Sequence, residues 1–581
     1  ASLGIGANIP NLVDSQTRQL ISDTTITNGG HSVKFGINLS WMQSYLSNPK
    51  EALGNFVFNG NFTRNPFNNR GGQPFADFLL GIPFRSDVAL PVYANLRTPF
   101  YHFYAQDEWR ASRKLTLNFG LRYELNLPWV ETRNRQTNYD IDTDPDNPRL
   151  VVARDGSRFD RALVSTYRKS FAPRFGFAYQ LRSRTVLRGG YGIFIGAYEG
   201  TGGGRHLLGN PPHTLSVQIA TDSIRPSVVL QDGVPADVLI PRNVKNLRLT
   251  SFEVRPKWPA SQQWNFNVQQ QFGPDVVWEA GYYSAKSDHQ PTRWNANYAL
   301  PGPGNINARR RWKSVVYPGT GIVIEPLAIL DAHSFFGSNI FHSLQTRVEK
   351  RFSGGFSLLG SYLFSKNIGD TSGFAGSGSA PGNAGGFQDP LNRRLERSID
   401  DQNMKHRFVA SYLYELPLGR GKAWGSAWNS PVNAILGGWQ VSGITTLTSG
   451  QPVSLTVRGD PANTGDTNRP NVAGEWRLGR SRRTLDGFFN TSAFAPNDPY
   501  TYGNAGRNVL EDPGLVNFDF AAFKRFALTE RFHMQFRFEA FNLFNTPHFG
   551  SPNAEVGNIN FGRITGAGRP RNLQFGLKFL F

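Results

Sequence analysis

The sequence has no cysteine among its 581 residues and only three methionines. The absence of cysteine excludes disulfide-stapled scaffolds, zinc sites built from thiolates and cysteine nucleophiles. Charged residues make up only 18% of the chain, and no run of apolar residues is long enough for a transmembrane helix. The first residues also lack a basic segment followed by an apolar block, so no signal peptide is recognisable.

The commonest catalytic and nucleotide-binding motifs are missing as well. The sequence contains no G-x-x-x-x-G-K-[ST], no H-E-x-x-H and no G-x-S-x-G pattern. We therefore predict neither an enzyme nor a bound cofactor.

What the sequence does contain is glycine, phenylalanine and positive charge. It has 61 glycines, 45 phenylalanines and 37 prolines, and aromatic residues reach 13%. This aromatic content argues against a disordered chain, because disordered chains carry few aromatic residues. The net charge of +19 indicates attraction to a polyanion, such as nucleic acid, anionic lipid or an acidic ligand, or a basic rim on a large surface.

Apolar and polar residues alternate along many segments, most clearly in residues 33–41, 115–123 and 573–581. Such alternation is typical of a β-strand with one face in an apolar medium and the other in a polar medium. About seventeen segments show it: residues 17–27, 31–46, 53–63, 84–93, 99–110, 114–125, 171–182, 184–194, 262–273, 275–286, 339–352, 355–366, 404–416, 437–448, 516–527, 530–543 and 572–581. The best candidate for a helix is short, at residues 74–81.

Short and long connections alternate between these segments. Turns at 111–114, 273–275 and 353–355 alternate with long segments rich in Gly, Pro, Asn and Asp, which are residues 126–170, 195–261, 287–338, 367–403 and 449–515. Short periplasmic turns and long extracellular loops are typical of a transmembrane β-barrel. We therefore predict an all-β fold, an antiparallel barrel spanning residues 1–581, in the outer membrane of a Gram-negative bacterium.

The alternation also predicts the direction of each strand. If the long loops are extracellular, the strand at 572–581 runs toward the periplasm, and so does the strand at 17–27. A bacterial barrel closes with an even number of strands. Because about seventeen is odd, we expect at least one strand upstream of residue 1; a strand hidden in a long loop is the alternative.

Several blocks resemble the TonB-dependent receptor superfamily. They are YAQDEWRASRKLTLNFGLRY (104–123), HRFVASYLYELPL (406–418), GGWQVSGITTLTSGQP (437–452), GNAGRNVLEDPG (503–514), FRFEAFNLFNTPHFG (536–550) and the final RNLQFGLKFLF (571–581). More narrowly, they resemble the Oar-like branch, whose members carry a carboxypeptidase-regulatory-like domain and a plug ahead of the barrel. The resemblance is strongest after about residue 400.

The resemblance implies a monomeric barrel of about 22 strands, gated by a plug and energised by the TonB–ExbB–ExbD complex. No plug and no TonB box are recognisable before the first expected strand. The chain is therefore expected to be the C-terminal barrel portion of a longer receptor. The final strand, with Leu577, Phe579 and Phe581, resembles the signal read by the barrel-assembly machinery; it is also simply a closing strand.

One predicted external loop contains a basic cluster, Arg309, Arg310 and Arg311, followed by Trp312. Arginine side chains fit phosphate and carboxylate groups, so the cluster is a candidate contact for an anionic ligand or for lipopolysaccharide. A plain solvated basic loop is the alternative. Nucleic-acid binding is not predicted, because the aromatic residues belong to strands that face lipid.

A second loop contains alternating acidic residues, Asp140, Asp142, Asp144 and Asp146. Acidic oxygens at every second position are typical of calcium loops. The sixth position is Pro145 rather than glycine and the twelfth is Val151 rather than glutamate, which favours a solvated acidic loop over a metal site.

The leading hypothesis is thus a TonB-dependent transporter that takes up a ligand across the outer membrane. A surface-exposed adhesion or structural barrel, or an ungated porin, is the second hypothesis, and a soluble secreted β-protein is the third. The substrate stays open between oligosaccharide, peptide and metal chelate.

Overall fold

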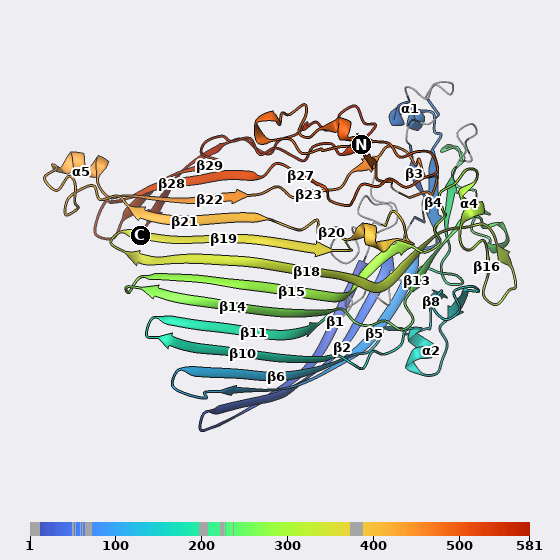
Figure 1. Cartoon of the computed structure of the whole chain (residues 1–581), viewed down its shortest axis with the longest axis horizontal. Coiled ribbons are helices and arrows are strands. Elements are labelled where there is room, and N and C mark those ends of the chain that lie inside the picture. Colours follow the sequence, from blue (N-terminus) through green and yellow to red (C-terminus); the bar gives the residue numbers. More distant parts are fainter. Residues whose placement is uncertain are drawn as a thin grey trace.

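The computed structural model describes residues 12–48, 51–52, 54–58, 60, 62–63, 72–196, 207–220, 226, 228–235, 237–371, 387–466 and 468–581. Its main feature is one large antiparallel sheet, in which each long strand is hydrogen-bonded to the next long strand along the chain (Figure 1). The long strands are β1 (Leu12–Asn28), β2 (His31–Asn48), β5 (Val92–Trp109), β6 (Leu115–Asn126), β10 (Phe171–Arg182), β11 (Thr185–Ile195), β14 (Ala260–Phe272), β15 (Val276–Asn295), β18 (Leu327–Ser353), β19 (Phe356–Gly369), β21 (His406–Glu415), β22 (Trp439–Thr448), β28 (Leu515–Ala527), β29 (His533–Phe541) and β31 (Asn572–Leu580).

Shorter elements lie in the connections. Six short strands extend the large sheet: β3 (Asn55–Val57), β4 (Arg85–Ala89), β7 (Val130–Glu131), β12 (Ser216–Ala220), β13 (Leu247–Phe252) and β20 (Ser398–Ile399). Five two-stranded pairs are β8 (Thr137–Asp140) with β9 (Arg149–Val152), β16 (Val315–Val316) with β17 (Val323–Ile324), β23 (Pro452–Val453) with β27 (Leu510–Glu511), β24 (Thr456–Val457) with β30 (Glu555–Val556), and β25 (Asn471–Val472) with β26 (Phe494–Ala495).

The helices are all short. They are α1 (Pro74–Leu79), α2 (Arg158–Ala162), α4 (Ile306–Arg309), α5 (Ser430–Leu436), η1 (Pro241–Asn243), η3 (Arg393–Glu396), η4 (Arg480–Arg482) and η5 (Thr491–Ala493). Within the described ranges, no helix has the length and apolar character needed to cross a membrane. The short helix expected at residues 74–81 is confirmed as α1.

The two ends of the sheet differ in their connections. At one end the turns are tight, as between β18 and β19, where Gly354 and Gly355 have φ angles of +59° and +79°. Positive φ at both central residues is what a two-residue hairpin turn requires, and glycine adopts it without steric cost. At the other end, the connections are long and pack together into a cap, which Figure 1 shows on the right. We call this body of loops the cap throughout.

The register of the strands gives the sheet two different faces. On β2, Phe35 and Trp41 are 43% and 44% exposed and share one face, while Lys34, Asn38 and Ser40 share the other. The apolar face continues on the neighbouring strand β5, where Phe103 points to the same side of the sheet, and on the strands beyond it. A continuous band of exposed aromatic and aliphatic side chains is the face that a barrel presents to lipid.

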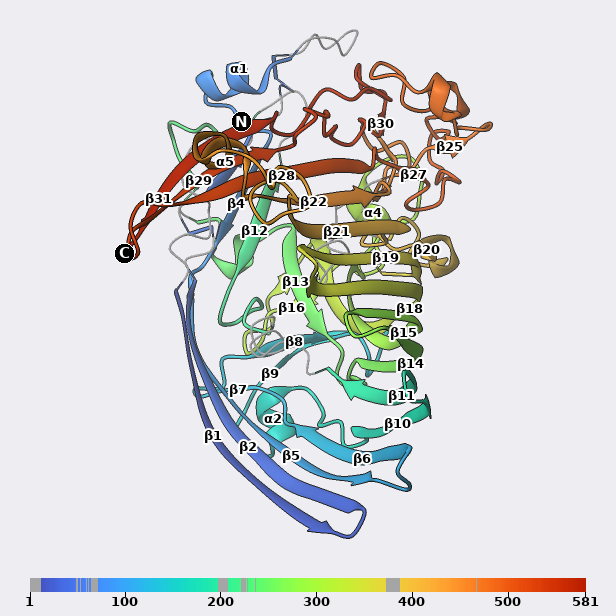
Figure 2. The same ribbon diagram turned by 90° about the vertical axis from the view of Figure 1, so that its left-hand side faces the viewer.

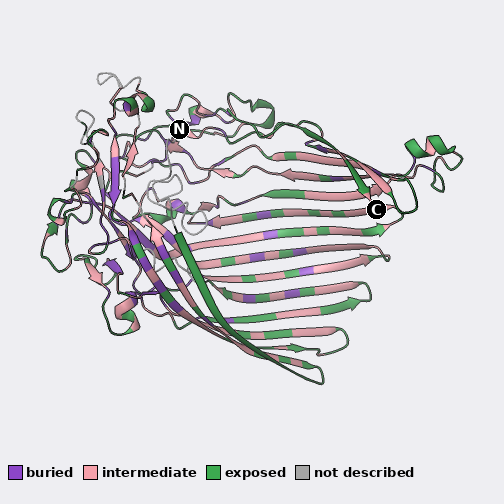
Figure 3. Cartoon of the chain, turned by 180° about the vertical axis from the view of Figure 1, so that it is seen from behind, coloured by how far each residue is buried: buried purple, intermediate pink, exposed green. Residues whose placement is uncertain are grey.

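The polar face lies on the inside of the curve. Figure 2 shows the sheet bending around the cap strands and α2. On this face, Leu46 and Leu96 near the cap end of β2 and β5 are buried against Trp129 and Leu208 from two long loops. The cap therefore packs into the mouth of the curved sheet, and buried residues gather at this end of the strands (Figure 3).

The wall of long strands has two strands at its edges, β1 and β31. Among the described strands, β1 pairs with β2 and β31 pairs with β29. All 17 residues of β1 are exposed. The described strands thus form a curved sheet with two free edges.

Fifteen of the expected segments form the long strands, and the two others belong to the cap. Residues 84–93 contain β4, whose Asp87, Val88 and Ala89 are all buried, so the strand has no face left for lipid. Of residues 53–63, only 55–57 form a strand, while residues 53, 59 and 61 lie outside the described residues.

Candidate functional site

The inner face of the sheet carries opposite charges two positions apart on the same strand. Arg122 Nε lies 2.6 Å from Glu124 Oε1 on β6, and Arg347 Nη2 lies 2.6 Å from Glu349 Oε2 on β18. Residues two positions apart on a strand share a face, so the spacing itself brings each pair together. The inner wall is therefore polar and charged, with many of its charges compensated locally.

A column of amide side chains follows β14 on the same inner face. Gln263, Asn265, Asn267 and Gln269 occupy every second position of the strand. An amide both donates and accepts hydrogen bonds, so such a column suits a ligand rich in hydroxyl or peptide groups. Sequence analysis missed this column, although its spacing was visible.

The amide column borders a hollow in the inner wall. Gln269 lies opposite Glu279 on β15, and the Tyr283 hydroxyl donates to Glu279 Oε1 at 3.3 Å. Glu279, Tyr283, Arg347 and Arg407 line the hollow together with neighbouring residues from β18 and β19. Carboxylate, phenol and guanidinium groups therefore converge at one place on the wall.

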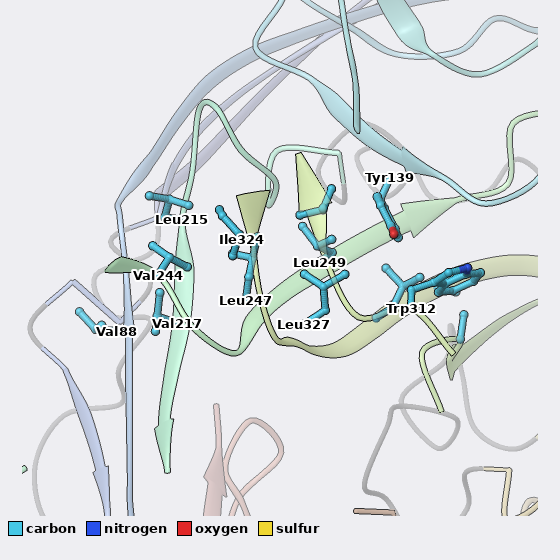
Figure 4. Close-up of a cluster of buried hydrophobic side chains, with 14 residues drawn as sticks. Val88, Tyr139, Leu215, Val217, Val244, Leu247, Leu249, Trp312, Ile324 and Leu327 are labelled. Carbon is cyan, nitrogen blue, oxygen red and sulfur yellow. The ribbon is translucent and has the colours of Figure 1, made fainter. Parts of the chain in front are cut away.

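The cap is held together by its own hydrophobic core. Figure 4 shows Leu215, Val217, Leu247, Leu249 and Leu327, which come from β12, β13, β18 and the segments beside them, packed against one another. All five are at most 3% exposed. A packed core of this kind orders long loops, because each buried aliphatic side chain adds about 1.5–3 kcal/mol of hydrophobic stabilisation.

The predicted basic cluster lies in the cap, and two of its arginines are committed to internal contacts. Arg310 is 8% exposed and donates from Nη1 to the Asn297 carbonyl oxygen at 2.7 Å and from Nε to Asn307 Oδ1 at 3.0 Å. Burial lowers the pKa of Arg310 from its ordinary value. Arg309 donates to the carbonyl oxygens of Leu300 and Asn463. These two residues stabilise the cap.

Arg311 and Trp312 connect the basic cluster to the acidic loop. Trp312 is 7% exposed, and its Nε1 donates to the Pro145 carbonyl oxygen at 3.1 Å. The Arg311 guanidinium stacks over the Trp312 ring at 4.4 Å and is exposed to solvent. Of the three arginines in the predicted contact, Arg311 is the exposed one, and its Nη2 lies 3.5 Å from the Pro145 carbonyl oxygen.

The carboxylates of the acidic loop accept hydrogen bonds from backbone amides. Asp140 Oδ1 accepts from the amides of Asp142 and Thr143, both at 3.0 Å, and Asp142 Oδ2 accepts from the Val254 amide at 2.8 Å. Burial raises the pKa of Asp142, and its hydrogen bond to Val254 opposes that shift.

Asp144 has the same role one turn further on, since its Oδ1 accepts from the amides of Asp146 and Asn147 at 3.3 and 3.2 Å. The described residues contain no group of three or more His, Cys, Asp or Glu side chains placed to hold a metal ion. The solvated acidic loop stays the prediction here, with calcium binding at Asp140, Asp142 and Asp144 as its weaker alternative.

Sequence analysis missed a buried ion pair that links two cap loops. Arg469 Nη1 and Nη2 lie 2.7 and 2.9 Å from the two carboxylate oxygens of Glu396. Gln388 Oε1 accepts from the Arg469 amide at 2.6 Å. No local sequence pattern predicts this pair, because Glu396 and Arg469 belong to different loops.

Two further carboxyl groups in the cap have perturbed acidity. Desolvation raises the pKa of Asp466 to about 6, although its carboxylate accepts from Asn295 Nδ2 at 3.1 Å. Desolvation likewise raises the pKa of Asp400 to about 6, with the neighbouring Asp401 adding to the shift and Arg507 opposing it. Both groups lie where loops meet.

The residues of the predicted assembly signal lie on the edge strand β31 and directly after it. Leu577 and Phe579 are 60% and 57% exposed on the apolar face of β31. Phe581 follows the strand, is 95% exposed and contacts the Phe532 ring at a centroid distance of 6.2 Å. Recognition of these residues by the assembly machinery stays a prediction.

Comparison with solved structures finds large outer-membrane proteins at low identity. The outer membrane transporter YddB from Escherichia coli is 11% identical and has a TM-score of 0.49, with 98% of this chain and 54% of that chain covered. The ferric-catecholate import receptor Fiu from Escherichia coli K12 is 11% identical, with a TM-score of 0.43 and coverage of 98% and 54%. BauA, the ferric preacinetobactin receptor from Acinetobacter baumannii, is 10% identical, with a TM-score of 0.43 and the same coverage.

This chain therefore spans about half the length of the solved structures it matches. No curated protein sequence matches it. The model of one protein family, the outer membrane beta barrel domain, matches residues 1–574. The match covers nearly the whole chain, and it agrees with the apolar outer face, the tight turns and the long loops of the structure. This chain is therefore a member of the outer membrane β-barrel domain family.

Proposed function

We propose that this chain forms most of the barrel wall and the cap of a TonB-dependent transporter that takes up a ligand across the outer membrane. The Oar-like assignment of the sequence blocks is part of this proposal, as are a plug, a carboxypeptidase-regulatory-like domain and energy supply by TonB–ExbB–ExbD. Membership of an outer-membrane family removes the soluble secreted β-protein from the alternatives.

The observation that carries the proposal is the pair of free edges. Exposed edges with unpaired amides and carbonyls are not stable in the hydrocarbon of a membrane, so β1 and β31 need further partners. β1 begins at the cap end and β31 finishes at the tight-turn end, so an odd number of further strands would close an even barrel.

Apolar side chains on the otherwise polar inner face are an argument that a plug fills the barrel. Ile21 on β1, Leu359 on β19 and Ile444 on β22 share the face of Asn38 and Arg347, and they are 56%, 41% and 48% exposed. Water inside an open pore gives no reason for large apolar groups at these positions. A folded plug that packs against the wall would cover them.

The arrangement of the inner wall supports uptake of a ligand with many hydrogen-bonding groups. The amide column of β14 and the hollow around Glu279 and Arg407 offer donors and acceptors along the passage. Arg311 at the outer surface of the cap is the proposed first contact for an anionic ligand or for lipopolysaccharide. Oligosaccharide and peptide fit the amide column better than a compact metal chelate does.

The proposal is tested on the full-length protein purified from outer membranes. In a planar bilayer, a plugged transporter is expected to show no steady conductance and to bind the periplasmic domain of TonB. Steady open channels without TonB binding would establish an ungated porin instead, and a closed barrel without TonB binding would favour an adhesion or structural role.

A blot with antibody to the C-terminal strand adds an independent size test. A band that shifts on heating and migrates well above the 64.7 kDa of this chain is expected for a receptor with a plug. A heat-shifted band near 64.7 kDa would contradict the plug and gated transport.

A further inference from the structure

One connection at the tight-turn end of the sheet is much longer than the others. Between β21 and β22 the chain runs through residues 416–438 and includes α5, whereas β10 and β11 are joined by residues 183–184 and β18 and β19 by residues 354–355. Figure 1 shows α5 projecting beyond the neighbouring turns at the end opposite the cap. We call residues 416–438 the α5 segment.

The α5 segment has a defined internal structure. Asn429 caps the helix, with its Oδ1 accepting from the Val432 amide at 3.0 Å. The Arg420 amide donates to Asn433 Oδ1 at 2.8 Å, and its guanidinium donates to the Trp428 carbonyl oxygen at 3.1 Å. These bonds fix the helix relative to the rest of the segment, so the side chains it exposes are presented in one arrangement.

The end of α5 is attached to the lipid-facing side of the sheet. Trp439 Nε1 donates to the Ile435 carbonyl oxygen at 2.9 Å, and Lys524 Nζ donates to the Asn433 carbonyl oxygen at 3.4 Å. Trp439 and Lys524 are register partners on the outer face, where the Trp439 ring also meets the Phe536 ring edge-on at 6.1 Å. The segment thus continues the apolar outer face of the sheet.

Large apolar side chains of the segment have no protein cover among the described residues. Trp424 and Ile435 are each 66% exposed, and Leu436 is 49% exposed. The Lys422 ammonium of the same segment lies on the other side of the wall, where it pairs with Glu415 of the inner face at 3.2 Å. Exposed apolar groups gathered on one segment mark a surface that another apolar phase covers.

We propose that the α5 segment is an anchor in the periplasmic leaflet of the outer membrane, where it contacts phospholipid. Tryptophan, present here as Trp424 and Trp439, is suited to the membrane–water interface, because it has an apolar body and a polar end. Ile435 and Leu436 enter the boundary of the acyl chains. Lys524 is only 4% exposed and holds the segment against the sheet, with its ammonium 5.8 and 5.0 Å from the centroids of the Trp439 and Phe526 rings. The proposal depends on the outer-membrane location and not on transport.

These 581 residues contain no cysteine, so single labelled cysteines can be placed in them within the full-length protein, after any cysteine elsewhere in that protein has been replaced by serine. Ile435→Cys carries an environment-sensitive fluorophore in vesicles of phosphatidylethanolamine and phosphatidylglycerol. Leu344→Cys, on the outer face of β18, is the lipid control, and Arg113→Cys, in the short β5–β6 turn, is the aqueous control. Heat-modified migration confirms that each variant is folded.

Quenching distinguishes the possible surroundings of position 435. Doxyl-labelled phospholipid is expected to quench the label at position 435 about as strongly as the label at position 344. Iodide is expected to quench the label at position 435 several-fold less than the label at position 113. Iodide quenching equal to that at 113 would overturn the proposal, because the segment would then lie in water. Protection from both quenchers would overturn it too, because a protein partner would then cover the segment.

Discussion

Glu396 and Arg469 form a buried, two-pronged ion pair that joins two loops of the cap across 73 positions of sequence. Their side chains are 1% and 2% exposed, and the Arg469 Nε donates further to the Ala505 carbonyl oxygen at 3.0 Å. A paired and fully hydrogen-bonded charge is tolerated in a protein interior, whereas either charge alone is strongly unfavourable there. The pair therefore fixes the relative position of the two loops.

Removing one partner of this pair is expected to loosen the cap. Glu396→Ala leaves the Arg469 guanidinium buried without its carboxylate, which costs about 3–5 kcal/mol. Hydrogen exchange of the peptides around residues 387–403 and 463–472 should rise in this variant, while the peptides of the barrel strands stay protected.

Two further variants make the interpretation specific. The double variant Glu396→Leu with Arg469→Met removes both charges and should recover much of the protection. Glu475→Ala breaks an exposed pair with Arg477, 3.8 Å apart, and should cost less than about 1 kcal/mol. Equal effects of Glu396→Ala and Glu475→Ala would contradict the structural role of the buried pair.

Titration of Asp466 should make the cap more stable in mild acid than at neutral pH. Its pKa is about 6 in the folded cap and its ordinary value is 3.8, so the folded state binds the proton more tightly than the unfolded state. The resulting stabilisation is fully present below the ordinary pKa and is lost as the pH rises through about 6. Hydrogen exchange in the cap, corrected for intrinsic rates, should therefore slow between about pH 7.5 and about pH 5.

Asp466→Asn keeps the side-chain shape and the acceptor for Asn295 but removes the titration. This variant should show a flatter pH dependence than the native protein, while Asp498→Asn, on the exposed surface, should leave the dependence unchanged. If Asp466→Asn kept the pH dependence of the native protein, other titrating groups would be responsible for the slower exchange in acid.

The strands of the wall were predictable from sequence for a simple physical reason. A strand between lipid and a polar interior must alternate apolar and polar residues, and β31 does so from Leu573 to Phe579. Segment 84–93 followed a similar pattern but became the cap strand β4, because Val88 faces the hydrophobic core of the cap rather than lipid. Periodicity indicates that one face is covered by something apolar, but it does not say whether that is lipid or protein.

The contacts within the cap could not be predicted in the same way. Residues 309–312 were recognised as one cluster and residues 140–146 as another, yet only the folded cap brings Trp312 to the Pro145 carbonyl oxygen. Glu396 and Arg469 carry no local signal at all. Ligand-facing and structural arginines look alike in sequence, because burial is decided by loops that are far apart along the chain.

The arginines of the basic cluster should differ sharply when they are replaced. Arg310→Ala removes two hydrogen bonds of a buried cation and should destabilise the cap, by about 1.5–3 kcal/mol for each charged bond. Arg311→Ala removes an exposed guanidinium and should leave hydrogen exchange of the cap nearly unchanged. Binding of lipopolysaccharide to the purified protein should weaken in Arg311→Ala, and no change there would remove Arg311 from the proposed contact.

Adjacent residues of β6 provide a matched test of the two faces. Phe119 is 44% exposed on the outer face near the middle of the strand, and Asn118 points to the inner face. Phe119→Arg should destabilise the barrel, because it places a charge on the lipid face, where the cost rises from about 0–1 kcal/mol near the interface to about 2–4 kcal/mol at the midplane, and the Asp107 carboxylate opposite it lowers that cost. Asn118→Arg should have a much smaller effect on unfolding by urea in lipid vesicles. Similar losses in both variants would contradict the assignment of the faces.

The last residue offers a test of assembly that is separate from stability. Phe581 is 95% exposed and extends the apolar face of β31, whereas Leu580 beside it belongs to the other face. If the assembly machinery recognises the apolar face of the final strand, Phe581→Ala should lower the amount of heat-modifiable protein in the outer membrane, and Leu580→Ala should not. Refolding of the purified variants into detergent isolates intrinsic folding from assisted insertion. A loss in cells with normal refolding in detergent indicates a recognition signal, whereas equal losses in both would mean that Phe581 only helps to close the barrel.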